Sequence, residues 1–289
     1  MKWNYLNKAC GFDNLSAEHI KYAHPSLIVI LTKLFNIWMY MGIVPDDLGL
    51  GITKSIPKFK GVKKMCTVDD FRGITICPIL SKIFELCLIR YFNVLPTSER
   101  QFGFKKGSSC HLAIHSVTKV INYFVQKGST INLGAIDLKK AFDKVSHFGL
   151  LCTLQEKQID IKLINIIENW LCKSRSKIDW DGITANPVIC SAGVRQGGVL
   201  SPVLFSIFVD VLLEKMQHSG LGCFINFGCQ NSFMYADDLI LVSHSVSDLQ
   251  SMLDLCSMTF KTLDLPINLE KATVYALVLD IILNVFHYN

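Results

Sequence analysis

Two adjacent carboxylates, Asp237-Asp238, lie between two short apolar stretches of the chain. The stretch before them, Phe233-Met-Tyr-Ala236, and the stretch after them, Leu239-Ile-Leu-Val242, have the length and composition of strands. A hairpin of this kind sets two like charges side by side at its tip, where the core of a sheet has no structural use for them. The pattern therefore favours a bound cation at the tip, and an ordinary polar turn is the alternative interpretation.

A third carboxylate strengthens the case for a metal. Asp137 ends the apolar run Ile131–Ile136, which predicts a strand. If that strand lies beside the hairpin at 232–243, three carboxylates meet at one edge of the sheet. Mg²⁺ prefers such oxygen ligands and keeps positions for water and substrate phosphates. The three residues thus indicate two Mg²⁺ ions, with Mn²⁺ as the alternative ion, in a site for phosphoryl transfer.

A glycine-rich segment, Gly193-Val-Arg-Gln-Gly-Gly-Val-Leu-Ser-Pro202, is the next candidate for a ligand contact. Glycines allow the backbone to approach a ligand closely, and the Gln196 side chain can donate an amide hydrogen bond. Ser201-Pro202 predicts the start of a helix. The alternative is a plain loop before a well-capped helix.

The charge of the chain is mildly positive. Among 289 residues, 29 are Lys or Arg and 24 are Asp or Glu, which gives a net charge of +5 and permits a polyanionic partner. Five lysines fall within eleven residues that contain no acid: Lys54, Lys58, Lys60, Lys63 and Lys64. Such a run is usually a solvated face, but beside a nucleic acid it would supply affinity that falls as salt rises.

Half of the residues are hydrophobic, so a membrane span has to be considered. The best candidate, residues 26–44, has Lys33 near its middle, which is costly in a bilayer. Its spacing favours a helix facing a core through Ile30, Leu31, Leu34, Ile37, Trp38 and Met41. The eleven cysteines are scattered singly, which indicates reduced thiols in an intracellular protein and no zinc site.

The remaining pattern predicts an α+β chain. Helices are expected over residues 77–92, 111–125, 147–172 and 247–263, and a hairpin over 177–190. In the first of these helices, the predicted core side is Ile79, Leu80, Ile83, Leu86, Cys87 and Tyr91. The order of elements predicts a mostly antiparallel sheet with helices on one face.

Taken together, the segments resemble the reverse transcriptase domain of non-LTR (LINE-type, jockey-like) retrotransposons. Tyr235-Ala-Asp-Asp238 is similar to the Y-A-D-D box of that family, and Asp137-Leu-Lys-Lys-Ala-Phe-Asp143 to its D-x-x-K-A-F-D block. Gly193–Pro202 matches its G-x-x-Q-G-x-x-L-S-P segment. Three further matches are Phe71–Ile76, Gln101-Phe-Gly-Phe104 and Leu265-Pro-Ile-Asn-Leu-Glu-Lys271. The six segments stand in the order of the family.

The resemblance implies roles for individual residues. Asp137, Asp237 and Asp238 would bind two Mg²⁺ ions, with the Leu138 carbonyl assisting. Lys271 would neutralise or protonate the departing pyrophosphate, and its alternative is a plain surface lysine.

The resemblance also implies a nucleotide site. Phe142 would pack under the sugar and exclude a 2′-hydroxyl, and its alternative is a core phenylalanine. Arg72 and one lysine of the basic run would hold the triphosphate. Gln196 and Gly197 would line the nucleotide pocket.

The implied protein is an RNA-directed DNA polymerase that uses an RNA template, a DNA primer and deoxynucleoside triphosphates. It would act without a membrane, in the cytoplasm and nucleus, as a retrotransposon ribonucleoprotein. The implied fold is a right-hand polymerase with fingers and palm, the palm being an antiparallel sheet backed by helices. The expected parts are a helical extension (1–45), a fingers-like region (46–130), the palm (131–275) and a non-matching apolar tail (276–289).

The thumb is expected to be largely absent, because only 18 residues follow Lys271. This departure keeps a second hypothesis open, a catalytically silent remnant that at most binds nucleic acid. A third option is another palm-fold enzyme, such as a nucleotidyl cyclase. It is weaker, because the segments around Arg72 and Phe104 resemble the fingers motifs of reverse transcriptases.

Overall fold

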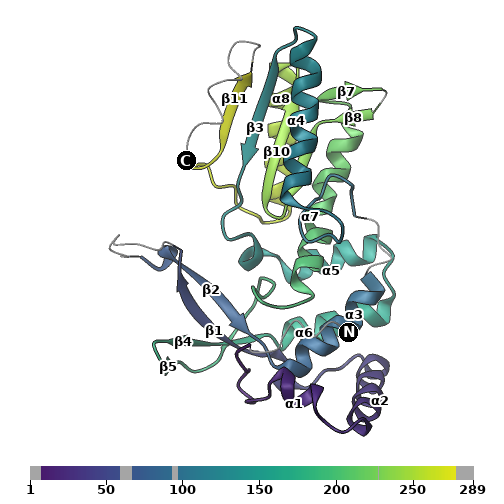
Figure 1. Ribbon diagram of the computed structural model, residues 1–289, viewed down its shortest axis with the longest axis vertical. Coiled ribbons are helices and arrows are strands. Elements are labelled where there is room, and N and C mark those ends of the chain that lie inside the picture. The colour runs from purple at the N-terminus through teal and green to yellow at the C-terminus, as the bar shows by residue number, and fades with distance from the viewer. Residues whose placement is uncertain (1–7, 59–66, 93–96, 227, 278–289) are drawn as a thin grey trace. The chain divides into compact units, whose positions relative to one another are not determined.

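A computed structural model describes residues 8–58, 67–92, 97–226 and 228–277 (Figure 1). The chain divides into two compact units that interleave along the sequence. Unit 1 comprises Met1–Leu95 and Ser146–Leu204, and unit 2 comprises Pro96–Val145 and Phe205–Asn289. The parts expected from the sequence were continuous segments, whereas each unit is built from two separate stretches.

Unit 2 contains a four-stranded antiparallel sheet in the order β11-β3-β10-β9. Figure 1 labels the first three of these strands. Its strands are β3 (Ile131–Ile136), β9 (Ser232–Tyr235), β10 (Asp238–Ser243) and β11 (Thr273–Leu277). The strand ending at Asp137 and the 232–243 hairpin were expected. Strand β11 was not, since its sequence had been assigned partly to a non-matching tail. Residues 278–289 lie outside the described part of the chain.

Helices cover both faces of this sheet. Helix α8 (Val246–Thr262) lies over Gly134, where a Cβ would come 3.4 Å from Leu249 Cδ1. Helix α4 (Cys110–Gln126) instead shares a buried cluster with Ile131 and Val242. Successive strand residues point to opposite faces, and Gly134 differs in parity from Ile131. The expectation of helices on one face only is therefore wrong.

The other elements of unit 2 are short except for α7 (Ser201–His218), which starts at the expected Ser-Pro pair and contributes its first four residues to unit 1. A hairpin of β7 (Cys223–Ile225) and β8 (Gly228–Gln230) follows α7. A short 3₁₀ turn, η3 (Ala141–Lys144), follows β3.

Unit 1 contains a second sheet in the order β2-β1-β4-β5, with β6 also paired to β4. Its strands are β1 (Leu50–Pro57), β2 (Phe71–Ile76), β4 (Arg175–Trp180), β5 (Ile183–Thr184) and β6 (Val188–Ile189). Strands β1 and β4 run parallel. The expected hairpin at 177–190 exists as β4 with β5 and β6, but its pairing with β1 could not be inferred from sequence.

The helices of unit 1 are α1 (Ala17–Lys21), α2 (Ser26–Met41), α3 (Ile79–Phe92), α5 (His147–Glu156) and α6 (Ile161–Cys172), with 3₁₀ turns η1 (Asp46–Gly49) and η2 (Val68–Asp70). The single helix expected over 147–172 is two helices. Asp160 caps the second of them, because its side chain accepts a hydrogen bond from the Lys162 N–H at 2.8 Å.

Two expected core faces are only partly confirmed. In α2 the buried side chains are Phe35 and the expected Trp38, which pack on Phe84 of α3, while the expected Ile30, Ile37 and Met41 are exposed. This helix is apolar on nearly every side, so spacing alone could not choose its inner face. Of the described helices, none is long and apolar enough to cross a membrane.

In α3 the error has another cause. The buried face is Ile79, Ser81, Phe84, Glu85, Leu88 and Phe92, whereas the expected Tyr91 is exposed. The buried face keeps the expected Ile79 but also carries a serine and a glutamate, which a pattern of apolar residues does not select.

Glu85 is the buried charge that holds the glycine-rich loop in place. Its carboxylate accepts hydrogen bonds from the backbone N–H groups of Val199 and Leu200, the latter at 2.7 Å, and from the Ser81 hydroxyl at 3.3 Å. These N–H groups immediately precede α7 and have no partner within the helix. Burial raises the pKa of Glu85, although the backbone N–H groups oppose that change.

The raised pKa of Glu85 makes a prediction about stability and pH. Below the usual pKa of 4.5 the carboxyl is protonated in both the folded and the unfolded chain; at higher pH the unfolded chain ionises first. The free energy of unfolding of the wild type should therefore fall, relative to Glu85→Gln, as pH rises from about 4.5 through the folded pKa. Urea unfolding at several pH values measures this difference.

The exposed Glu168 of α6 provides the matched control, because Glu168→Gln makes the same substitution on the surface. The free energy of unfolding of the wild type, relative to Glu168→Gln, should not fall as pH rises over the same range. A wild type that gains stability over Glu85→Gln with rising pH would contradict the effect of burial on Glu85.

Candidate active site

The two adjacent aspartates lie in and after a two-residue turn. Strands β9 and β10 pair through Tyr235 and Asp238, which leaves Ala236 and Asp237 as the turn. Ala236 has a φ of 58°, in the left-handed region that non-glycine residues rarely adopt. The expected hairpin is confirmed, and its tip has a strained backbone beside the carboxylates.

The expected adjacency of Asp137 to this hairpin is also confirmed. Strands β3 and β10 are antiparallel neighbours, with Leu239 opposite Ile136. One step further along the same register, Asp238 stands opposite Asp137. The two carboxylates are therefore cross-strand neighbours at one end of the sheet, with Asp237 next to them in the turn.

The three carboxylates are close enough to disfavour one another's ionisation. The pKa of Asp238 is raised first by burial, then by the charges of Asp237 and Asp137, while Lys271 acts in the opposite direction. A carboxylate that is hard to ionise beside two others is stabilised as an anion by a cation.

Asp137 is held by the loop that precedes β11. Its carboxylate lies 2.9 Å from the Lys271 ammonium and accepts a hydrogen bond from the Asn268 side-chain amide at 2.8 Å. The Asn268 backbone N–H also donates to the Asp137 carbonyl at 2.8 Å. The hydrogen bond and charge of Asp137 raise the pKa of Lys271, with smaller contributions from Asp238 and Asp237. Lys271 thus belongs to the same electrostatic cluster.

Asn268 was not singled out from the sequence. The motif ending at Lys271 contains it, but only the fold shows that it reaches Asp137 by both backbone and side chain. Leu138, the expected carbonyl ligand, is buried at 3% exposure and forms an antiparallel bridge with Ile267 of the same loop. The loop that contains Ile267 and Asn268 therefore contacts both Asp137 and Leu138.

The chemistry of this donor set fits a divalent metal. Three carboxylates supply hard oxygen donors. Burial and then the charges of Asp237 and Asp137 raise the pKa of Asp238, and a cation would offset that negative charge. In the described part of the chain, no three His, Cys, Asp or Glu side chains already stand close enough together to hold an ion. Asp137 bonds instead to Lys271 and Asn268.

Phe142 lies in an aromatic stack in unit 2. Its ring is stacked on Phe205 with centroids 4.7 Å apart and meets Phe104 edge-on at 5.6 Å. The ring is partly buried. Packing by Phe205 holds one side of the ring in place, as a gate beside a sugar would need.

The remaining candidates belong to unit 1. The Thr75 N–H of β2 donates to the Gln196 carbonyl at 2.7 Å. Gly197 has a φ of 118°, and a Cβ there would lie 2.3 Å from the Thr75 carbonyl oxygen, so only glycine fits. Arg72 is exposed on the same strand, three residues before Thr75. Arg72 is therefore part of β2, and Gln196 and Gly197 lie against the same strand at Thr75.

Arg195 anchors this loop from its other side. Its guanidinium donates to the carbonyls of Gly49 and Leu48 and to the Ser174 hydroxyl. With Glu85 it fixes the loop at two points of unit 1. Of the basic run, Lys54 pairs with Asp179 at 3.6 Å, while Lys60, Lys63 and Lys64 lie outside the described residues.

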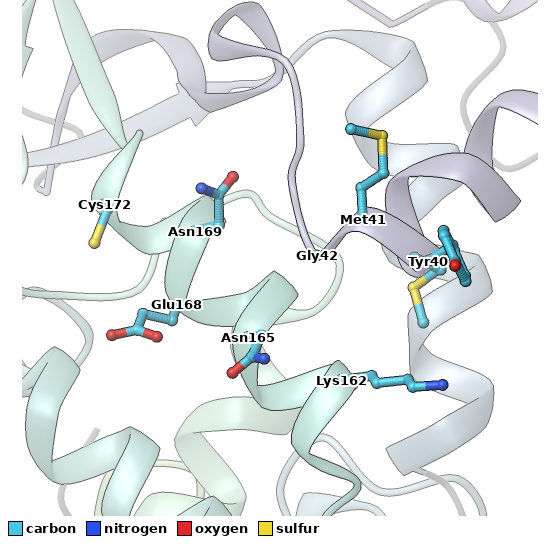
Figure 2. Close-up of a pocket in the computed structure, with 9 residues that line it drawn as sticks. Tyr40, Met41, Gly42, Lys162, Asn165, Glu168, Asn169 and Cys172 are labelled. Carbon is cyan, nitrogen blue, oxygen red and sulfur yellow. The ribbon is translucent and has the colours of Figure 1, made fainter.

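A pocket of about 410 Å³ lies elsewhere in unit 1, between the end of α2 and α6 (Figure 2). Its lining includes Tyr40, Lys162, Asn165 and Glu168 but none of the expected site residues. The carboxylate cluster does not coincide with this pocket.

Comparisons with known proteins agree with these motifs. Residues 56–280 match the family model described as reverse transcriptase (RNA-dependent DNA polymerase). The Pol polyprotein of the Drosophila melanogaster retrotransposable element R2DM is 26% identical over 84% of this chain and 23% of its own length. The polymerase of the mobile element jockey from Drosophila funebris is 26% identical over 82% of this chain and 26% of its own length.

Solved structures support the fold. The apo telomerase of Candida tropicalis superposes with a TM-score of 0.59 at 14% identity, covering 87% of this chain and 55% of the telomerase chain. The chain spans about a quarter of the length of these two retrotransposon relatives. With its matching family model over most of its length, the chain belongs to the reverse transcriptase (RNA-dependent DNA polymerase) family and is related to non-LTR retrotransposon polyproteins.

Proposed function

We propose that this chain is the catalytic core of an RNA-directed DNA polymerase that adds deoxynucleotides to a DNA primer on an RNA template. The primer 3′-hydroxyl would attack the α-phosphorus of the incoming triphosphate, forming a phosphodiester bond and breaking the bond to pyrophosphate. The observation that carries the proposal is the meeting of Asp137, Asp237 and Asp238 at one end of the unit 2 sheet. The family and its polymerase relatives support it.

Asp137, Asp237 and Asp238 would hold two Mg²⁺ or Mn²⁺ ions. Such ions favour ionisation of the attacking hydroxyl and stabilise charge on the leaving group. Asp137 would have to exchange its contacts with Lys271 and Asn268 for this role. The ammonium of Lys271, released from Asp137, would then be available to neutralise phosphate oxygens.

The unit 1 residues would bind the triphosphate and base. Arg72 supplies a guanidinium for phosphate oxygens, and the pinned loop presents Gln196 beside a glycine that lets the ligand approach the backbone. Phe142, backed by Phe205, would exclude a 2′-hydroxyl.

The first test replaces a proposed metal ligand. Loss of a residue that merely supports a metal ligand costs about 10–100-fold, so Asp237→Asn should lower primer extension on an RNA template by at least about 100-fold. Asp254→Asn, an exposed change on α8 of the same unit, is the control and should keep wild-type extension.

Equal extension by wild type and Asp237→Asn would refute the assignment of the carboxylates. Salt-dependent RNA binding without Mg²⁺-dependent extension by wild type would instead favour the silent remnant that binds nucleic acid.

The second test concerns the choice of sugar. Phe142→Val shortens the proposed gate while Phe205 remains in place, so incorporation of ribonucleotides relative to deoxynucleotides should rise by about 10–200-fold. Single-nucleotide extension with each substrate measures the ratio. Phe224→Val, an exposed change on β7, is the control. An unchanged ratio in Phe142→Val would leave Phe142 a core residue only.

The third test uses two glycines with positive φ. Gly197→Ala forces a Cβ against the Thr75 carbonyl, whereas Gly182→Ala, at φ +83°, meets nothing within 4 Å. Both carry a backbone cost of about 1–3 kcal/mol, but only the first should displace Gln196 and raise the KM for deoxynucleotides by about tenfold. Steady-state kinetics decide; equal KM values for the two variants would contradict a nucleotide-binding loop.

A further inference from the structure

Gln101 is a buried polar side chain to which the proposed chemistry gives no role. It is 1% exposed and lies in the Gln101–Phe104 motif, which the sequence suggested was part of the fingers. In the structure it belongs to unit 2 and forms a parallel bridge with Met234 of β9. It therefore lies beside the strand that leads into the carboxylate turn.

Both polar atoms of the Gln101 side-chain amide form hydrogen bonds with the backbone of the turn. Its Oε1 accepts hydrogen bonds from the N–H groups of Ala236 at 3.2 Å and of Gly103 at 2.8 Å. Its Nε2 donates to the Ala236 carbonyl at 3.4 Å. One side chain thus pairs with both backbone polar groups of the residue before Asp237.

Ala236 needs such support. Its φ of 58° lies in the left-handed region, which costs an alanine about 1–2 kcal/mol. The first position of a hairpin turn with this geometry usually holds glycine. Gly103 lies directly against the Ala236 backbone. A Cβ at this position would lie 2.2 Å from the Ala236 nitrogen, so a larger residue would push the turn away.

The segment that carries Gln101 is itself fixed. The Ser98 N–H donates to the buried carboxylate of Asp210 on α7 at 2.7 Å. Arg100 donates to the Cys229 carbonyl at 2.6 Å and to the Gln230 side chain. Gln101 is therefore presented to the turn by a rigid support.

We propose that Gln101 is a positioning residue that holds Ala236 in its left-handed conformation and thereby aims the carboxylates of Asp237 and Asp238. This inference rests on the proposed polymerase function, but its structural half concerns the turn alone. Displacing catalytic groups by about 1 Å can cost about 100-fold in rate.

The test is a double-mutant cycle on the full chain. Gln101→Met keeps the approximate side-chain volume and removes the amide, so primer extension should fall at least about tenfold and the Mg²⁺ concentration for half-maximal rate should rise. In this background Ala236→Gly removes the cost of the left-handed backbone and should recover extension by at least about fivefold. Gln250→Ala, an exposed change on α8, is the control.

Amide hydrogen exchange provides a measure independent of activity. Gln101→Met should speed exchange at the Ala236 N–H by at least about tenfold, since its acceptor is lost. Gly103→Ala, which presses on the Ala236 backbone and leaves the Gln101 amide in place, should likewise lower extension. This second variant keeps the test decisive should Gln101→Met fail to fold.

The outcomes separate the two ideas. Unchanged exchange at Ala236 in Gln101→Met, or extension that Ala236→Gly does not recover, would overturn the positioning role. Faster exchange in Gln101→Met, in a chain whose wild type extends no primer, would support the hold on the turn while the proposed function fails.

Discussion

Mutual repulsion of three carboxylates at the end of two antiparallel strands is the constraint around which unit 2 is organised. The register of β3 and β10 sets Asp137 opposite Asp238, and Asp237 follows from the turn. Each charge raises the free energy of the others as anions. Lys271 offsets part of this charge, since its ammonium lies 2.9 Å from Asp137. The remaining negative charge is the reason for proposing a divalent cation at this end of the sheet.

The backbone around these charges is held by contacts distant in sequence. Asn268, in the loop before β11, donates a hydrogen bond to Asp137. Gln101, in the segment before α4, accepts a hydrogen bond from the Ala236 N–H. In unit 1, Glu85 and Arg195 hold the glycine-rich loop in the same manner. In both units, polar side chains that are buried or partly buried hold the turns and loops that carry candidate residues such as Asp237 and Gln196.

Much of this could be predicted from the sequence where local pattern decides. The hairpin around Asp237, the strand ending at Asp137 and the family motifs were predictable, because short apolar runs and the polar residues that bound them are local signals. The inner face of α2 was not, since that helix is apolar on nearly every side. The roles of Glu85, Asn268 and Gln101 were hidden as well, because their partners lie 115, 131 and 135 residues away.

The central claim, that these carboxylates form a metal site, is tested most directly by adding Mn²⁺ to the isotopically labelled chain and recording which backbone amides lose NMR intensity. We expect early losses at Asp137 and at Ala236–Leu239, with smaller losses after Asp137→Asn. Losses centred elsewhere, for example at Asp46-Asp47, or unchanged amides around Asp137 and Asp238, would contradict a metal site at this edge of the sheet.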